Sequence, residues 1–112
     1  MAILEHEGLR PKIDPTARIA PIATVCGDVT VGPNTYVGFG AVIVAESGPV
    51  EIGANCVIMD TAVLRGLKHA KLTLGDNVLV GPRAYMPEVM PRYAAALCRR
   101  HATDCEVTIA SP

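Results

Sequence analysis

Tryptophan is absent from this chain of 112 residues, and its aromatic side chains are limited to three Tyr and one Phe. This composition excludes a core of bulky aromatic rings and favours many contacts between small aliphatic side chains. An excess of charge of either sign is also missing, since 10 basic and 11 acidic residues give a formal net charge of −1. The basic residues are scattered, and only Arg99 and Arg100 are adjacent. We therefore expect no nucleic-acid partner, which would need a clustered basic face.

Long apolar runs are missing as well, and no stretch approaches the roughly 20 residues of a membrane span. No basic segment followed by an apolar run marks a signal peptide. We expect a cytoplasmic protein with no membrane contact. The cysteines, which show no C-x-x-C spacing, are Cys26, Cys56, Cys98 and Cys105. This spacing favours buried thiols over a zinc knuckle, a redox pair or a disulfide framework.

What the chain does contain is a repeat of six residues. Aliphatic side chains recur at this interval, with interruptions at "VAESGPVE" and "RGLKHAKLT". The positions are Ile13, Ile19, Val25, Val31, Val37, Ile43, Ile52, Ile58, Leu64, Leu74, Val80 and Met86. Other columns keep the same step. Small residues follow four places later, as at Ala17, Ala41 and Ala62. Gly follows directly at Gly32, Gly38, Gly53, Gly75 and Gly81, and Asn stands three places on at Asn34, Asn55 and Asn77. Gly and Asn suit corners where φ turns positive.

This pattern predicts a parallel β-helix, in which each hexapeptide forms a short strand and a corner, and three sides form one coil. An amphipathic helix does not fit, because six is no multiple of 3.6 and Gly and Pro recur. An antiparallel sandwich would alternate with period two. We predict one all-β domain over 1–112, with about four coils over 13–90.

The repeat stops at "PEVMPRY", because Pro cannot donate a hydrogen bond to a strand ladder. Pro91 can begin a helix, and Ala94, Leu97, Cys98 and His101 share one face at helical spacing. We predict a C-terminal α-helix over 91–102 that covers either apolar surface or the open coil end, with a truncation remnant as the alternative. Residues 103–112 form either a tail or a short strand at "CEVTI".

The hexapeptide columns and the segment "IDPTARIAPIATVCGDVTVG" resemble γ-class carbonic anhydrases and their relatives among the hexapeptide transferases. The loop "AVIVAESGPVEIG" is similar to the "AVLRGD" segment of that family in length and position. The resemblance implies a left-handed β-helix. It also implies a homotrimer, which fits a core as thin as four coils of Val, Ile and small residues.

Such enzymes hold a zinc-like metal with three histidines, two from one subunit and one from its neighbour. Laid over this chain, the first histidine falls on Arg65 in "VIMDTAVLR", and the other two fall on Pro82 and Pro87 in "VGPRAYMP". The family's Asp is retained at Asp60, and the Asp of "RGD" becomes Glu46. In this alignment all three metal ligands are replaced.

A variant branch of these relatives matches "LRGLKHAKLTLGDNVLVGPRAYM" better. There His69 is retained, while Arg83 and Tyr85 stand at the other two histidine positions. A cation and a phenol cannot replace two neutral imidazoles, so His69 is the one candidate metal ligand. His6 and His101 lie outside the repeat and are expected on the surface.

We therefore predict a γ-carbonic anhydrase-like protein with an eroded metal site, no cofactor and an unknown small-molecule ligand, acting as a non-catalytic or structural homotrimer. The candidate site residues are His69, Asp60, Arg65 and Glu46. Arg65 is expected to pair with Asp60 or Glu46, so that a guanidinium replaces the metal's charge. The alternative is a working enzyme, either a zinc-dependent hydratase of the carbonic anhydrase type or a small acyltransferase that uses His69.

Overall fold

The computed structural model describes residues 1–66, 71–86 and 107–110. The strands in these ranges are β1 (Ala2–Leu4), β2 (Lys12–Ile13), β3 (Arg18–Ile19), β4 (Thr24–Val31), β5 (Tyr36–Val37), β6 (Val42–Ile52), β7 (Val57–Ile58), β8 (Val63–Gly66), β9 (Lys71–Leu74), β10 (Leu79–Val80), β11 (Tyr85–Met86) and β12 (Val107–Ala110). Within the same ranges, no helix is long and apolar enough to cross a membrane.

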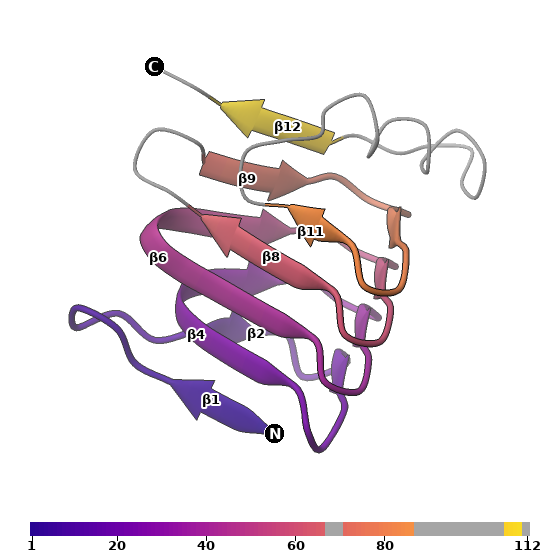
Figure 1. Cartoon of the computed structure of the whole chain (residues 1–112), viewed down its shortest axis with the longest axis horizontal. Coiled ribbons are helices and arrows are strands. Elements are labelled where there is room, and N and C mark those ends of the chain that lie inside the picture. The colour runs from indigo at the N-terminus through magenta and orange to yellow at the C-terminus, as the bar shows by residue number, and fades with distance from the viewer. Residues whose placement is uncertain (67–70, 87–106, 111–112) are drawn as a thin grey trace.

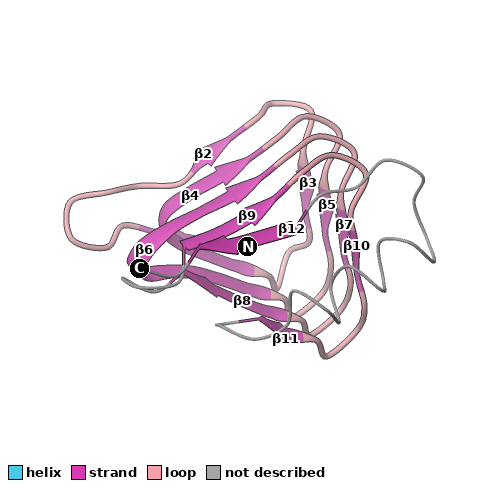
Figure 2. Cartoon of the chain, turned by 90° about the horizontal axis from the view of Figure 1, so that it is seen from above, coloured by secondary structure: helices cyan, strands magenta, loops and turns pink. Residues whose placement is uncertain are grey.

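The strands wind into a parallel β-solenoid of about four turns with three flat sides (Figures 1 and 2). The first side contains β1, the first halves of β4 and β6, then β8 and β11. The second side contains β2, the second halves of β4 and β6, and β9. The third side is the sheet β3, β5, β7 and β10. The predicted all-β parallel coil and its number of turns are therefore confirmed.

The strand register confirms the aliphatic ladders. On the second side Ile13 pairs with Val31, Val31 with Ile52, and Ile52 with Leu74. The ladders of the third and first sides run through Ile19, Val37, Ile58 and Val80, and through Val25, Ile43, Leu64 and Met86. Inside the prism the central ladder residues are almost fully buried, whereas Ile13 and Ile19 in the first coil are only partly covered. A single coil cannot bury its own aliphatic face, so the stacking of coils forms the core.

The corners correct one expectation and support another. Asn34, Asn55 and Asn77 adopt φ of 57°, 57° and 60°, as their turn tendency predicted. The Gly column, by contrast, does not carry positive φ, and the expectation for Gly32 and Gly38 was wrong. A side chain at Gly32 would overlap the backbone of Gly53 in the next coil. Glycine is needed there because adjacent coils approach too closely for a Cβ atom.

Among the described residues, coil length varies at the corner between the first and second sides, which we call the loop corner. Here the four residues 46–49 of β6 lie opposite the single residue Asp28 of β4. Residues 67–70, which continue this corner in the next coil, lie outside the described residues. The insertions therefore lengthen one corner and leave the ladders in step.

The C-terminal end differs from the coils. Strand β12 pairs antiparallel with β9, with Val107 opposite Leu74 and Ala110 opposite Lys71. A strand thus lies in the segment 103–112, where a tail or a short strand was predicted. The predicted helix over 91–102 lies outside the described residues.

Candidate functional site

The loop corner carries a short hairpin contributed by the N-terminus. His6 and Leu9 exchange backbone hydrogen bonds of 2.9 and 3.0 Å, so that only Glu7 and Gly8 form the turn. Both turn residues have positive φ, 52° for Glu7 and 78° for Gly8. This is the backbone conformation that a two-residue hairpin with the normal strand twist requires. The hairpin projects from the coil between β1 and β2 (Figure 2).

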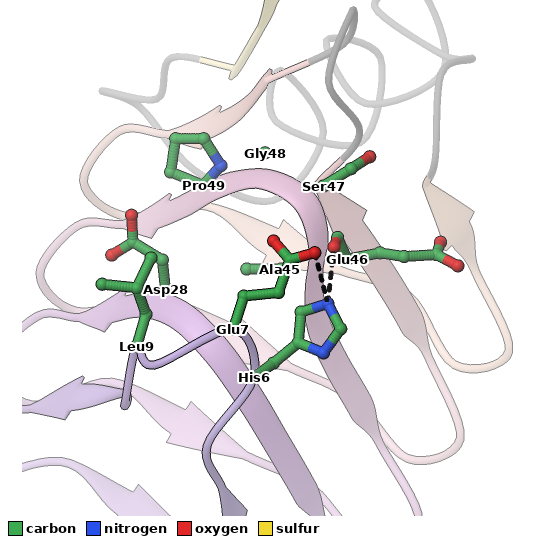
Figure 3. Close-up of a pocket in the computed structure, with 9 residues that line it drawn as sticks. All are labelled: His6, Glu7, Leu9, Asp28, Ala45, Glu46, Ser47, Gly48 and Pro49. Carbon is green, nitrogen blue, oxygen red and sulfur yellow. Dashed lines mark hydrogen bonds and ion pairs between the residues drawn. The ribbon is translucent and has the colours of Figure 1, made fainter.

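The imidazole of His6 connects this hairpin to the next-but-one coil. Its Nε2 atom lies 2.8 Å from the backbone oxygen of Glu46 (Figure 3). A carbonyl oxygen can only accept, so Nε2 carries the proton that is donated. The side chain of His6 is 39% exposed, and it therefore lies on the surface as expected, but with a defined partner.

A glycine in β4 makes room for this contact. Gly27 has φ of 86°, and a Cβ atom added to it would lie 2.8 Å from the Ala45 oxygen and 3.3 Å from the Cβ of His6. Any side chain at position 27 would therefore be strained and would push against both neighbours. The sequence gives no direct signal for this contact, because His6 precedes the repeat and Gly27 breaks the Gly column.

Glu46 is the second point of contact in the loop corner. Its carboxylate Oε2 accepts a hydrogen bond from Nη2 of Arg65 on β8 and forms an ion pair with it. The pair arises from the parallel register, in which Val44 lies opposite Arg65. The Arg65 and Glu46 side chains are 35% and 45% exposed, so the pair contributes at most about 1 kcal/mol to stability. Arg65 thus lies beside one of its two expected partners within the same chain.

Asp60 occupies a different corner, between the third and first sides. Its Oδ1 atom accepts a hydrogen bond of 3.0 Å from the backbone N–H of Phe39 in the preceding coil. Asp76 plays the same part at the corner between the second and third sides, where its Oδ1 accepts from the N–H of Ala54 at 2.7 Å. The bonding of Asp60 is therefore that of a turn carboxylate, which satisfies a backbone donor between coils.

The residues at the metal-ligand positions do not form a ligand set in the described part of the chain. Arg65 is a guanidinium without a lone pair to donate, and Pro82 is an exposed corner residue with no donor side chain. Arg83, which stands at a histidine position in the alignment with the variant branch, is an exposed turn residue with φ of 62°. His69 and Pro87 lie outside the described residues. Within residues 1–66, 71–86 and 107–110, no group of three His, Cys, Asp or Glu side chains could hold a metal ion.

A small cavity of about 130 Å³ lies between the hairpin and residues 46–49 (Figure 3). Leu9, Ala45 and Pro49 provide apolar walls, and Asp28 and Glu46 contribute polar groups. The cavity is open to solvent on one side and has room for several water molecules.

Two ionisable groups elsewhere have shifted pKa values. Burial raises the pKa of the Cys56 thiol, which lies in the core and is 3.1 Å from the Gly75 oxygen. Hydrogen bonds from the hydroxyl and backbone N–H of Thr16 lower the pKa of the Asp14 carboxyl. Neither group adjoins the loop corner, so both shifts reflect local structure.

Comparison with known proteins shows to which class of fold this chain belongs. No family model matches the sequence. A solved structure of a hexapeptide transferase family protein from Anaplasma phagocytophilum superposes with a TM-score of 0.68 at 26% identity, covering 75% of this chain and 49% of that one. A putative acetyltransferase from Bacillus cereus shares the fold alone, with a TM-score of 0.54 at 17% identity, covering 99% of this chain and 84% of that one. The chain is a hexapeptide-repeat β-solenoid.

The curated relatives narrow this class. A carbonic anhydrase from Geobacillus kaustophilus is 30% identical over 95 residues, which cover 85% of this chain and 52% of that protein. The carnitine operon protein CaiE of Escherichia coli O157:H7 is 31% identical over 86 residues, covering 77% of this chain and 44% of that protein. The chain belongs to the γ-carbonic anhydrase- and CaiE-like family of hexapeptide-repeat β-helix proteins. It spans about half the length of these relatives.

Proposed function

We propose that this chain is a γ-carbonic anhydrase-like protein whose metal centre has been replaced by an ion pair, and that it acts as a non-catalytic, structural homotrimer. The observation that carries the proposal is the bond between Arg65 and Glu46. Arg65 stands at the first histidine position, and its positive charge takes the place of the metal's charge. A guanidinium cannot lower the pKa of a bound water as zinc does, so no hydroxide nucleophile forms near neutral pH.

Elemental analysis of the purified full chain tests this proposal. We expect no stoichiometric zinc, cobalt or iron, and no hydration of carbon dioxide above the buffer rate. One metal ion per subunit, or one per three subunits, would refute the eroded site. If metal is found, His69→Ala tests whether His69 binds it and His101→Ala is the control, since the family alignment places only His69 at a ligand position.

The alternative function is a metal-dependent hydratase, or a small acyltransferase, that uses His69. Similarity to a carbonic anhydrase and to a hexapeptide transferase favours it. It requires ligands beyond the described residues or from a neighbouring subunit. Metal that is present in wild type, lost in His69→Ala and retained in His101→Ala would establish this alternative and exclude the proposal above.

Exposed apolar side chains support the homotrimer. Ile22, Phe39 and Met59 lie at the corner between the third and first sides in successive coils, and they are 67%, 49% and 37% exposed. Apolar groups that gather at one corner of successive coils suit a surface that packs against another subunit. We expect Phe39→Lys to weaken assembly in sedimentation velocity, whereas Thr30→Lys, on the second side, leaves it unchanged. A wild-type monomer at micromolar concentration would refute the trimer.

We infer a left-handed coil from the family resemblance, and a helix over 91–102 from its apolar spacing. A crystal structure of the full chain tests both. A right-handed coil, or an extended segment 91–102, would contradict the respective proposal.

A further inference from the structure

We propose that the hairpin His6–Leu9 is a lid over the cavity of the loop corner, and that the bond from His6 to Glu46 is its latch. The hairpin makes few other contacts. Leu9 is 50% exposed, the Glu7 side chain is 75% exposed, and a Cβ atom at Gly8 would meet no described atom within 4 Å. A segment with so little burial opens at low free-energy cost unless a specific bond holds it.

The latch is specific because its two halves are fixed independently. Gly27 leaves room for the Cβ of His6, which sets where the ring begins. Glu46 begins the four-residue insertion of β6, which sets where the accepting oxygen lies. The contact spans 40 residues of sequence, so it forms only when the first three coils are stacked.

Glu46 links the lid to the ion pair. Its backbone oxygen accepts from His6, and its side chain points away from His6 (Figure 3). The Glu46 carboxylate binds Arg65. Release of His6 removes a bond that orients the Glu46 backbone, and we expect this to loosen the hold of the Glu46 carboxylate on Arg65. This part of the inference rests on the proposed function, because it treats the Arg65 position as the replaced metal site.

The charged groups around His6 come from four elements. Glu7 belongs to the hairpin itself, with an oxygen 4.0 Å from Nε2. Asp28 and Glu46 come from β4 and β6, and Arg65, on β8, neutralises the Glu46 carboxylate. The separation of 4.0 Å is too long for a hydrogen bond, so the Glu46 oxygen is the partner that holds the lid.

Solvent exchange of backbone amides, measured by NMR on the ¹⁵N-labelled full chain, tests the lid. In His6→Ala we expect the amides at positions 6 and 9, each of which donates to the backbone oxygen of the other residue, to exchange about fivefold faster. The amide of Val57, which joins two adjacent coils through a bond of 2.9 Å to the Val78 oxygen, changes less than twofold. The side-chain Nε–H signal of Arg65 shifts in the same variant, because the Glu46 backbone has lost the bond from His6.

His6→Gln is the decisive rescue, because its side-chain nitrogen lies at a similar distance from Cβ as Nε2 and also donates. We expect this variant to restore exchange to within twofold of wild type. Glu7→Gln and Leu9→Ala are controls that keep the latch, and both are expected to behave as wild type.

Three outcomes would overturn the inference. They are unchanged exchange in His6→Ala, no rescue by His6→Gln, and equal acceleration of the hairpin amides and the Val57 amide, which would make His6 a stabiliser of the whole domain. An unmoved Arg65 signal alongside faster hairpin exchange would refute only the link to the ion pair. Stoichiometric metal in the wild-type protein would refute the proposed function and leave the lid intact, so the two failures are distinguishable.

Discussion

Replacing Thr35 with valine should destabilise the protein by about 2–3 kcal/mol, although the two side chains have nearly the same shape. Thr35 is fully buried at the corner between the second and third sides. Its hydroxyl donates to the Gly53 oxygen at 2.7 Å and accepts from the Cys56 N–H at 3.3 Å. Valine leaves both backbone groups without this partner.

The magnitude follows from those two bonds. A buried group that loses its partner costs about 1–3 kcal/mol, and the longer bond to Cys56 belongs at the lower end of this range. A valine at position 35 should cause little steric strain, because the equivalent residue two coils further on, Val78, is itself a valine and is only 2% exposed. For a domain slightly above 100 residues, the loss corresponds to a melting temperature lower by about 10 °C.

Urea denaturation followed by circular dichroism measures the difference, at two protein concentrations so that any assembly is accounted for. Thr35→Ser is the control, because it keeps the hydroxyl and loses one methyl group, at a cost of about 1 kcal/mol. If Thr35→Val proved as stable as wild type, or more stable than Thr35→Ser, the hydroxyl would not be what joins these coils.

Gly38→Ala should lose about 1–3 kcal/mol in the same assay, because its Cβ would collide with the Asp60 carboxylate and lie 3.0 Å from the Asp60 nitrogen. Gly81→Ala, at the same corner where no described atom lies within 4 Å, should stay within about 0.5 kcal/mol of wild type, and equal losses would contradict the steric explanation. Cys56 should resist alkylation in the folded protein at pH 8 while the partly exposed Cys26 reacts, as mass mapping can determine. Because burial raises the pKa of Cys56, the unfolded thiol ionises first, and stability should fall as pH rises above about 9; a fall just as steep in Cys56→Ala would assign it to other groups.

The sequence was sufficient to predict the coil, because its information is repeated. Each ladder position is an aliphatic with the same neighbours six residues away, and the observed pairs Val37–Ile58 and Ile43–Leu64 follow from counting. The six-residue repeat does not include Val50 and Leu72. They lie inside the interrupted segments, yet each is fully buried two places before a ladder residue. Side chains alternate between the two faces of a strand, so a residue two places before a ladder residue also points into the core, although it is not part of the six-residue repeat.

The candidate site could be predicted only in part. Alignment with the family left Asp60 and Glu46 as the expected partners of Arg65. In the structure the carboxylate of Glu46 forms the ion pair with Arg65. The contact of His6 with Glu46 could not be predicted, because it depends on how far one insertion projects beyond its neighbours. No local pattern encodes that distance, and the fit at Gly27 appears only once the coils are stacked.

The unequal loop corner also tells one coil from another. Val, Ile and Leu are nearly interchangeable as ladder residues, so the ladders alone would accept a chain that skipped a coil or paired with a coil of another copy. The corner lengths are not interchangeable. The single residue Asp28 lies opposite the four residues 46–49, and a shift by one turn would leave the longer insertion without its place. The length of this corner therefore distinguishes each turn of the solenoid from the others. We expect this difference to disfavour the exchange of coils between molecules during folding.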